Sequence, residues 1–175
     1  MRRLANSLVI CVVLSVNVSA QIPPTGILPY RDGRIYYAFN YTIATGSFTS
    51  SVKRPLAQYA DQINKQITES SRNMKNYLLY EDSMRIISNV KFVTTNNGQA
   101  ALYEGVATFV NLHDSVNVIL NDLTLIQSAQ RKDLSGIGEP AEKSDYRKNK
   151  PAMQLLGNAI ESFIKRYNGR LLDDN

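Results

Sequence analysis

The fold class depends on residues 102–126, which read LYEGVATFVNLHDSVNVILNDLTLI. Apolar side chains recur there every three or four positions, at Leu102, Val106, Phe109, Val116, Leu120, Leu123 and Ile126. That spacing predicts one apolar side of an amphipathic helix ending near Ala129. The stretch is also rich in β-branched residues, which favour strands, so a strand competes with the helix around 116–120.

Residues 55–78 carry a clearer amphipathic pattern. Its apolar positions are Leu56, Ala60, Ile63, Ile67, Met74 and Leu78. Pro55 suits the first turn of a helix, where its missing N–H costs nothing. Asn96-Asn97-Gly98 is a strong stop, because asparagine and glycine tolerate the left-handed backbone that ends helices or closes turns. We therefore predict a helix that begins at Pro55.

A third helix is predicted from Pro151. Its apolar side comprises Leu155, Leu156, Ala159, Ile160, Phe163, Ile164 and Tyr167. Asn168-Gly169 supplies its end signal. The residues before it, 130–150, are strongly charged and include glycine and proline, which predicts a polar linker on the surface.

Residues 34–43 alternate with a period of two. One side would carry Ile35, Tyr37, Phe39, Tyr41 and Ile43, and the other Arg34, Tyr36, Ala38, Asn40 and Thr42. This pattern of aromatic and β-branched residues predicts an extended strand. A single strand needs a hydrogen-bonding partner, and the nearest candidate is 89–95, which could equally end a helix.

Together these patterns predict a mainly α fold, an antiparallel three- to four-helix bundle with an N-terminal extended aromatic strand. The alternative is an α+β fold with a small sheet formed by 34–43 and 89–95. We expect a signal peptide at 1–20, an extended N-terminal segment at 21–50, and a helical domain at 51–175 that includes the 130–150 linker.

The first twenty residues predict secretion. Arg2 and Arg3 form a cationic start, an apolar run covers 8–14, and Val18-Ser19-Ala20 offers small residues for signal peptidase. Cleavage is expected between Ala20 and Gln21. The apolar run is too short to span a bilayer, which takes about 20 residues.

Composition limits the chemistry of the mature chain. Its only cysteine, Cys11, leaves with the signal, so no disulfide or thiol chemistry is expected. Loss of Arg2 and Arg3 lowers the net charge from +5 to about +3, far below the clustered basic charge of a nucleic-acid binder. We expect neither a nucleic-acid partner nor a stable membrane anchor.

No residue pattern predicts catalysis, a cofactor or a metal. His113 is the only histidine, and a catalytic or zinc role needs partners that the sequence does not mark, so we expect a packed or surface side chain. The acidic residues of the 130–150 linker match no calcium loop and lie among lysines and arginines.

Two features point to an extracellular surface. Asn40-Tyr41-Thr42 is an N-glycosylation sequon, and Asn40 falls on the side of its strand opposite the aromatic residues. Tyr30 and Tyr36 belong to a cluster of tyrosines, a residue type favoured at binding surfaces. We take these two tyrosines as a candidate interaction surface.

The leading prediction is a secreted, non-enzymatic extracellular protein that binds a protein partner or an extracellular surface. The alternative is a carrier of a small apolar ligand in a cavity of the helical bundle. A third hypothesis is a membrane-active helical protein, which ranks last because its charges are mixed.

Overall fold

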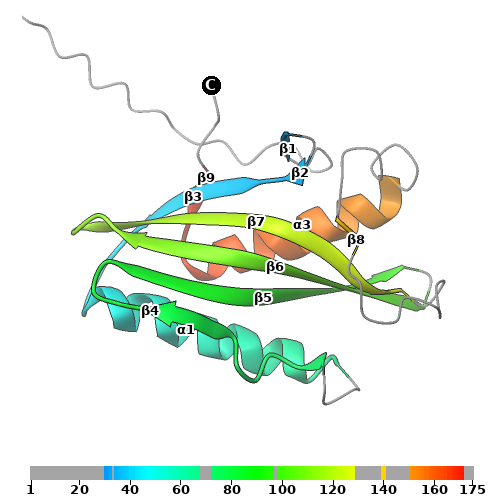
Figure 1. Ribbon diagram of the computed structural model, residues 1–175, viewed down its shortest axis with the longest axis horizontal. Helices are drawn as coiled ribbons and strands as arrows, with labels where there is room; N and C mark the ends of the chain where they lie inside the picture. The colour runs from blue at the N-terminus through cyan, green and yellow to red at the C-terminus, as the bar shows by residue number, and fades with distance from the viewer. Residues whose placement is uncertain are drawn as a thin grey trace, which may run out of the picture.

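The computed structural model describes residues 30–32, 34–67, 72–96, 98–128, 139–140 and 150–171. Its elements follow in chain order (Figure 1), and they are β1 (Tyr30–Arg31), β2 (Arg34–Ile35), β3 (Tyr37–Thr42), α1 (Phe48–Asn64), β4 (Leu78–Glu81), β5 (Arg85–Asn96), β6 (Gln99–Asn111), β7 (Ser115–Ser128), β8 (Glu139–Pro140), α3 (Lys150–Arg166) and β9 (Arg170–Leu171). No helix in these described ranges is long and apolar enough to cross a membrane.

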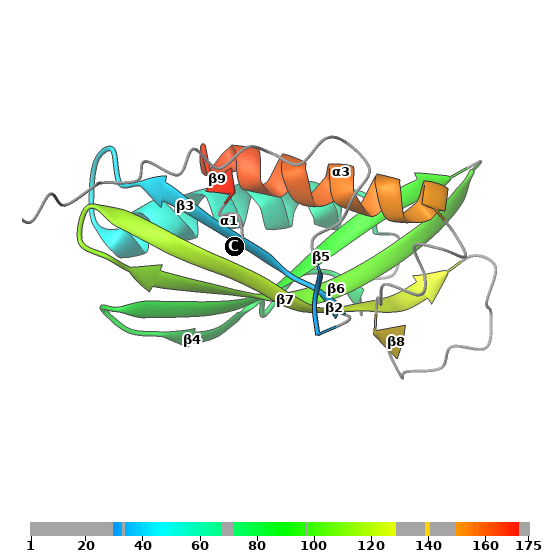
Figure 2. The same ribbon diagram turned by 90° about the horizontal axis from the view of Figure 1, so that it is seen from above.

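An antiparallel sheet is the centre of the fold. Its strand order is β4-β5-β6-β7-β3-β9, and β8 pairs with the far end of β7. Strands β1 and β2 form a separate small hairpin. Helices α1 and α3 both lie on one side of the sheet (Figure 2), and among the described residues no helix covers the other side. The predicted helical bundle is therefore wrong, and the molecule is mostly antiparallel sheet.

The stretch 102–126 belongs to two long strands and not to a helix. Strands β6 and β7 pair with Ala107 opposite Leu120 and Phe109 opposite Val118. Their connection passes through His113, whose φ of 70° lies in the left-handed region. Buried and half-buried residues alternate along most of both strands, but in β6 this alternation is hard to recognise from the sequence.

The alternation is hard to recognise in β6 because small residues occupy buried positions and valines occupy the opposite side. On the side of β6 that faces the helices, Gly105 and Ala107 occupy buried positions, while Val106 and Val110 point to the opposite side. Apolar residues therefore lie on both sides of the strand, and between the buried Tyr103 and Phe109 the buried side carries only Gly105 and Ala107. A Cβ at position 105 would lie 2.9 Å from Cδ2 of Leu123 and 3.1 Å from the carbonyl oxygen of Asn121, so any larger residue there would force β7 or the Leu123 side chain to shift.

Helix α1 begins earlier and ends earlier than the helix predicted from Pro55. Ser47 caps its start, because its side chain accepts from the backbone N–H of Ser50 while the Ser50 hydroxyl accepts from the backbone N–H of Ser47. Pro55 lies inside the helix. The helix ends at Asn64, so Met74 and Leu78 of the predicted stripe lie beyond it.

Helix α3 lies close to its predicted position and buries the predicted side. Leu156, Ile160 and Phe163 have no exposed surface, and Tyr167, just past the helix end, is buried as well. Asn168 adopts a left-handed conformation with φ of 51°, and the N–H of Gly169 donates to the carbonyl of Ile164. The predicted end signal is therefore confirmed.

The predicted strand over 34–43 is present as β2 and β3, but its predicted partner is wrong. Strand β3 pairs with β7, with Phe39 opposite Val118, and on its other edge with β9. Residues 89–95 lie within β5, between β4 and β6. The alternative sheet of 34–43 and 89–95 therefore does not form.

Aromatic side chains fill the space between the sheet and the helices. Phe163 of α3 meets Phe92 of β5 edge-on, and their ring centroids lie 5.9 Å apart. Its ring also packs on Tyr59 of α1 at 4.9 Å and on Tyr167 at 5.4 Å. This cluster joins both helices to the sheet, so the expected N-terminal and helical regions share one core.

The predicted signal peptide lies outside the described residues. Of the linker predicted over 130–150, the structure describes Glu139–Pro140, which pairs with β7, and Lys150, which begins α3.

Candidate binding site

The side of the sheet away from the helices, which we call the open face, carries the residues that alternate with the core. Most of its described side chains are β-branched or polar and half-buried, whereas Ala38 is buried. They include Ala38 and Asn40 of β3, Ile87, Asn89, Lys91 and Val93 of β5, Glu104, Val106, Thr108 and Val110 of β6, and Asn117, Ile119 and Asn121 of β7.

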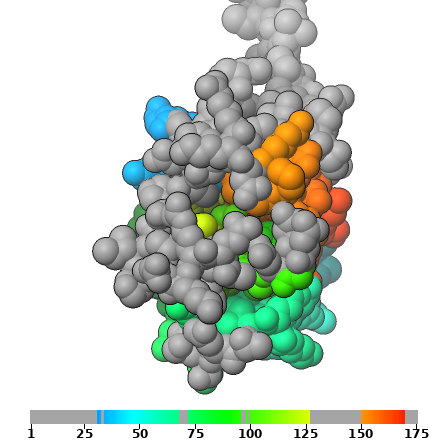
Figure 3. Space-filling model, turned by 90° about the vertical axis from the view of Figure 1, so that its right-hand side faces the viewer, coloured from blue at the N-terminus to red at the C-terminus, as the bar shows by residue number. Residues whose placement is uncertain are grey.

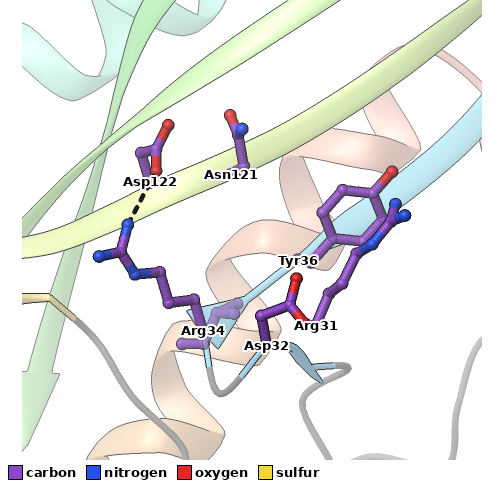
Figure 4. A pocket seen from close by; sticks show the side chains of 7 residues that line it. Arg31, Asp32, Arg34, Tyr36, Asn121 and Asp122 are labelled. Atoms are coloured by element: carbon purple, nitrogen blue, oxygen red, sulfur yellow. Dashed lines mark ion pairs between the residues drawn. The ribbon is translucent and has the colours of Figure 1, made fainter.

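A hollow lies on this face where the β1–β2 hairpin meets β7 (Figure 4). We call it the hairpin hollow. Its volume is about 540 Å³, and its walls are Arg31, Asp32, Arg34, Ile35, Tyr36, Asn121 and Asp122. Seen from the end of the molecule, the blue atoms of the hairpin project on the side opposite the orange and red atoms of α3 (Figure 3).

Two local features of the backbone shape the hairpin hollow. The hairpin turns at Asp32, which has a φ of 51°. On β7, Asp122 has a φ of 52°, and the register against β6 shifts between Glu104 and Val106, so β7 has a bulge there. The bulge projects Asp122 toward the hairpin (Figure 4).

Each arginine of the hairpin has an aromatic or acidic neighbour. The guanidinium carbon of Arg31 lies 5.3 Å from the ring centroid of Tyr36, which is a cation–π distance. Nη1 of Arg34 lies 3.5 Å from Oδ1 of Asp122, and the two side chains are 60% and 55% exposed. Arginine presents a planar set of donors that fits a carboxylate, so each guanidinium can bind an acidic group, while Asp32 and Asp122 balance the two positive charges of the hollow.

The predicted site residues fall on different parts of this surface. Tyr36 is half-buried and lines the hairpin hollow, whereas the side chain of Tyr30 lies outside the described part. Asn40 lies on the open face as predicted, and its Oδ1 accepts a hydrogen bond of 2.8 Å from Nδ2 of Asn117. Ala20 and Gln21 lie outside the described residues.

Arg31, Arg34 and Asp122 were not predicted as site residues. The local signal was Asp32-Gly33, a dipeptide typical of two-residue hairpin turns, within a segment expected to be irregular. His113 is exposed in the β6–β7 turn, and its backbone N–H donates to Oδ1 of Asn111. Within the described ranges, no three or more His, Cys, Asp or Glu side chains are grouped to hold a metal.

The strongly perturbed titratable groups lie in the core and not in the hollow. Burial raises the pKa of Tyr41 to about 12, and the Ser51 hydrogen bond opposes this shift. Burial also raises the pKa of Tyr59 and that of Tyr167 well above the ordinary value. The Tyr59 hydroxyl donates to the carbonyl of Lys91 at 2.7 Å, which indicates a structural role.

Comparisons with known proteins identify no family. No protein-family model and no curated protein matches the chain. A crystal structure of a TBP-like protein from Parabacteroides distasonis is similar at a TM-score of 0.48, with 13% identity over 81% of this chain and 97% of that one. A DUF4468 family protein from Bacteroides ovatus is similar at a TM-score of 0.39, with 12% identity over 81% and 84%. At these values we assign neither a family nor a function from either likeness.

Proposed function

We propose that this chain is a secreted extracellular protein that acts by binding a protein partner through the hairpin hollow. The observation that carries the proposal is the pair of exposed arginines, one stacked on Tyr36 and one beside Asp122, around a hollow of about 540 Å³. Tyrosine and arginine are the residue types most enriched among the energetically important residues of protein interfaces. The predicted signal peptide supports the extracellular setting.

The Arg34–Asp122 pair suits exchange with a partner. Both side chains are more than half exposed, and such ion pairs contribute only about 0–1 kcal/mol to folding. A carboxylate of the partner can therefore replace Asp122 at Arg34 with little loss of stability, on condition that the exposed Asp122 side chain turns away into solvent. Exclusion of water in the complex would strengthen the new pair.

The partner expected from this chemistry presents an acidic loop. Its carboxylate would contact Arg34, and an apolar or aromatic side chain would lie against the Tyr36 ring. Because Arg31 stacks on that ring already, less side-chain freedom is lost on binding.

The carrier hypothesis requires a cavity in a helical bundle, and the membrane-active hypothesis requires amphipathic helices with a free apolar side. Helices α1 and α3 bury their apolar sides against the sheet, so neither presents an inter-helix cavity wall or a free apolar face. No observation favours either hypothesis, and we do not propose them.

Capture with matched baits tests the proposal. Wild-type protein, Arg34→Ala, Tyr36→Ala and the control Lys165→Ala are immobilised and exposed to extracellular fluid from the producing organism. Lys165 is exposed on α3, on the other side of the molecule. We expect one protein to be retained by wild type and control, with affinity about tenfold lower for either hairpin variant, as truncation of an important interface residue predicts.

The retained protein is then purified and its affinity measured directly for all four baits. Equal affinity for the four baits, or retention of no protein, would contradict the proposal. Export has its own test, since mass spectrometry of the secreted chain should show an N-terminus at Gln21. Intact Met1 in the secreted pool would rule out the predicted cleavage.

A further inference from the structure

A second hollow on the open face lies beside the opposite edge of the sheet. We call it the Lys91 hollow, and its volume is about 320 Å³. It is lined by Asn73, Met74, Lys75, Asn76, Tyr77, Asn89, Lys91 and Glu104. Its floor comes from β5 and β6, and its wall is the segment 72–77 that precedes β4.

Several contacts fix the wall in place. The backbone N–H of Met74 donates to Oδ1 of Asn64 at the end of α1, over 2.6 Å, and the Met74 side chain is buried. The carbonyl of Arg72 accepts from Nζ of Lys91 at 2.8 Å. The carbonyl of Tyr77 accepts from the backbone N–H of Asn89 at 2.8 Å. The hollow is therefore formed before any ligand binds, which lowers the entropic cost of binding.

Lys91 and Glu104 face each other across the strands at the floor of the hollow. They are directly paired positions of β5 and β6, and Nζ of Lys91 lies 3.9 Å from Oε1 of Glu104. The Lys91 side chain is only 11% exposed, and its contact with the Arg72 carbonyl is its single hydrogen bond within the described residues. An ammonium has three donors, and leaving donors unused at a largely buried site costs free energy.

A hydroxyl group fits between these two side chains. Typical hydrogen bonds of about 2.8 Å from Nζ and about 2.7 Å to a carboxylate oxygen can meet at one atom across such a gap. A hydroxyl oxygen would accept from Lys91 and donate its proton to Glu104. A purely anionic ligand would gain from Lys91 but would be repelled by Glu104.

The remaining polar groups also favour a ligand with several hydroxyls. Asn73, Asn76 and Asn89 line the hollow, and their side chains make no hydrogen bond within the described residues. Each amide has both donors and an acceptor, as adjacent hydroxyl groups require. The volume lies near the lower end of ligand sites, about 300–1,000 Å³, which suits a small ligand. The exposed Lys75 is at the rim, where solvent screens its charge.

We propose that the Lys91 hollow binds a neutral carbohydrate of one or two sugar units. The site is independent of the hairpin hollow, because Asn89 and Asn121 are separated by Val106 in one row across the sheet. The backbones of Asn89 and Asn121, one from each hollow, are therefore two strand spacings apart, about 10 Å.

NMR titration of the full mature chain tests this inference. The probes are methyl glycosides of glucose, galactose, mannose and N-acetylglucosamine, with inorganic phosphate as the anionic comparison. We expect at least one glycoside to shift the side-chain amide signals of Asn73, Asn76 and Asn89 saturably, with a Kd of about 1 mM. Signals of Asn117, on the same face but outside the hollow, should stay in place.

Variants identify the groups that carry the binding. Lys91→Met removes the donor to the bridging hydroxyl and should weaken binding about tenfold, whereas Glu104→Gln replaces the charged acceptor with a weaker neutral one and should weaken binding severalfold. Lys91→Met also removes the hydrogen bond to the Arg72 carbonyl and could disturb the wall. Asn76 is exposed, so Asn76→Ala should leave the fold intact, and we expect it to weaken binding severalfold. Lys165→Met on α3 should bind as wild type.

Three outcomes would overturn the proposal. One is the absence of saturable shifts with every glycoside at about ten times the expected Kd. Another is tighter binding of phosphate than of any glycoside. The last is unchanged glycoside affinity in both Glu104→Gln and Asn76→Ala. Each is distinct from a failure of the hairpin hollow, whose test uses other residues and another probe.

Discussion

The two sides of the sheet differ sharply although the same strands build them. On the helix side, Phe39, Phe92 and Phe109 have no exposed surface. Their sequence neighbours Asn40, Lys91 and Val110 are half-buried on the open face. Adjacent residues therefore contribute differently: those on the helix side form the core, and those on the open face are available for the binding that we propose. Substitutions should separate these two roles cleanly.

The largest stability effect is expected at Phe163. Its ring packs against Phe39, Tyr59, Phe92 and Tyr167, so truncation removes contacts to both helices and to the sheet. We expect Phe163→Ala to lower the free energy of unfolding by about 3–5 kcal/mol in urea denaturation.

The matched change on the open face is Ile119→Ala. Ile119 is half-buried, and no helix in the described part of the chain lies over it, so we expect a loss of under about 2 kcal/mol. Equal losses for the two variants would show that the open face is as much a part of the core as the helix side.

A smaller effect is expected at Gly169, where the backbone lies against buried side chains of the core. A Cβ on Gly169 would lie 2.5 Å from Cδ2 of Phe39 and 2.9 Å from Cγ2 of Ile164. Both neighbours are buried, so the structure must shift, and Gly169→Ala should cost about 1–3 kcal/mol. Thermal unfolding measures the change.

Gly98→Asn is the control for Gly169→Ala. Gly98 has a φ of 77° in the β5–β6 turn, and a Cβ there would meet no atom within 4 Å. Asparagine tolerates this conformation, so its melting temperature should stay near that of wild type. A loss as large as that of Gly169→Ala would refute the steric explanation.

The buried tyrosines predict a pH effect that is absent at neutral pH. The pKa of Tyr41 is raised by burial to about 12, whereas the unfolded chain has the ordinary value of about 10. The folded state therefore holds the phenol proton more tightly, and this contribution is complete below pH 10 and is lost as the pH rises through 12. Melting temperatures should fall over that window.

Tyr41→Phe should make the decline in melting temperature shallower. Tyr36→Phe on the open face should leave it unchanged. A curve for Tyr41→Phe that is identical to wild type would mean that Tyr41 ionises freely in the folded protein.

Helix α3 was predictable because its signals are local. Leu156, Ile160 and Phe163 recur at helical spacing, and Asn168-Gly169 follows them directly. The apolar side of the helix packs against the sheet, so the spacing of apolar residues in the sequence matches the spacing of buried residues in the structure.

Strands β6 and β7 were not predictable by the same reasoning. The buried residues Phe109, Val116, Leu120 and Leu123 come from two strands, yet their spacing along the chain also fits one helix. The turn between them contains His113 in a left-handed conformation, where glycine or asparagine would have signalled a hairpin. Sheet pairing supplied the information that local periodicity lacked.

The candidate site also has parts that local sequence predicts and parts that depend on strand pairing. Tyr36 was identified from its residue type, and Asp32-Gly33 held a usable turn signal. The pairing of Arg34 with Asp122 depends on the register of β7 and on its bulge, and both are set by contacts between distant parts of the chain. Local sequence patterns do not encode such a register.

The smallest stability effect is expected in the hairpin hollow. Arg34→Ala removes an ion pair between side chains that are both more than half exposed, so the free energy of unfolding should change by about 0–1 kcal/mol. Asp122→Gly removes the same pair but relieves the left-handed conformation at φ 52°, so it should be neutral or slightly stabilising.

Urea denaturation of both variants and of their double mutant measures the coupling between the two side chains directly. A coupling well above about 1 kcal/mol would show that the pair holds the hairpin in place and is not free to exchange with a partner's carboxylate. The proposal predicts a coupling near zero, with partner binding lost in Arg34→Ala but kept in Asp122→Gly. That result would mean that Arg34 contributes to recognition and not to stability.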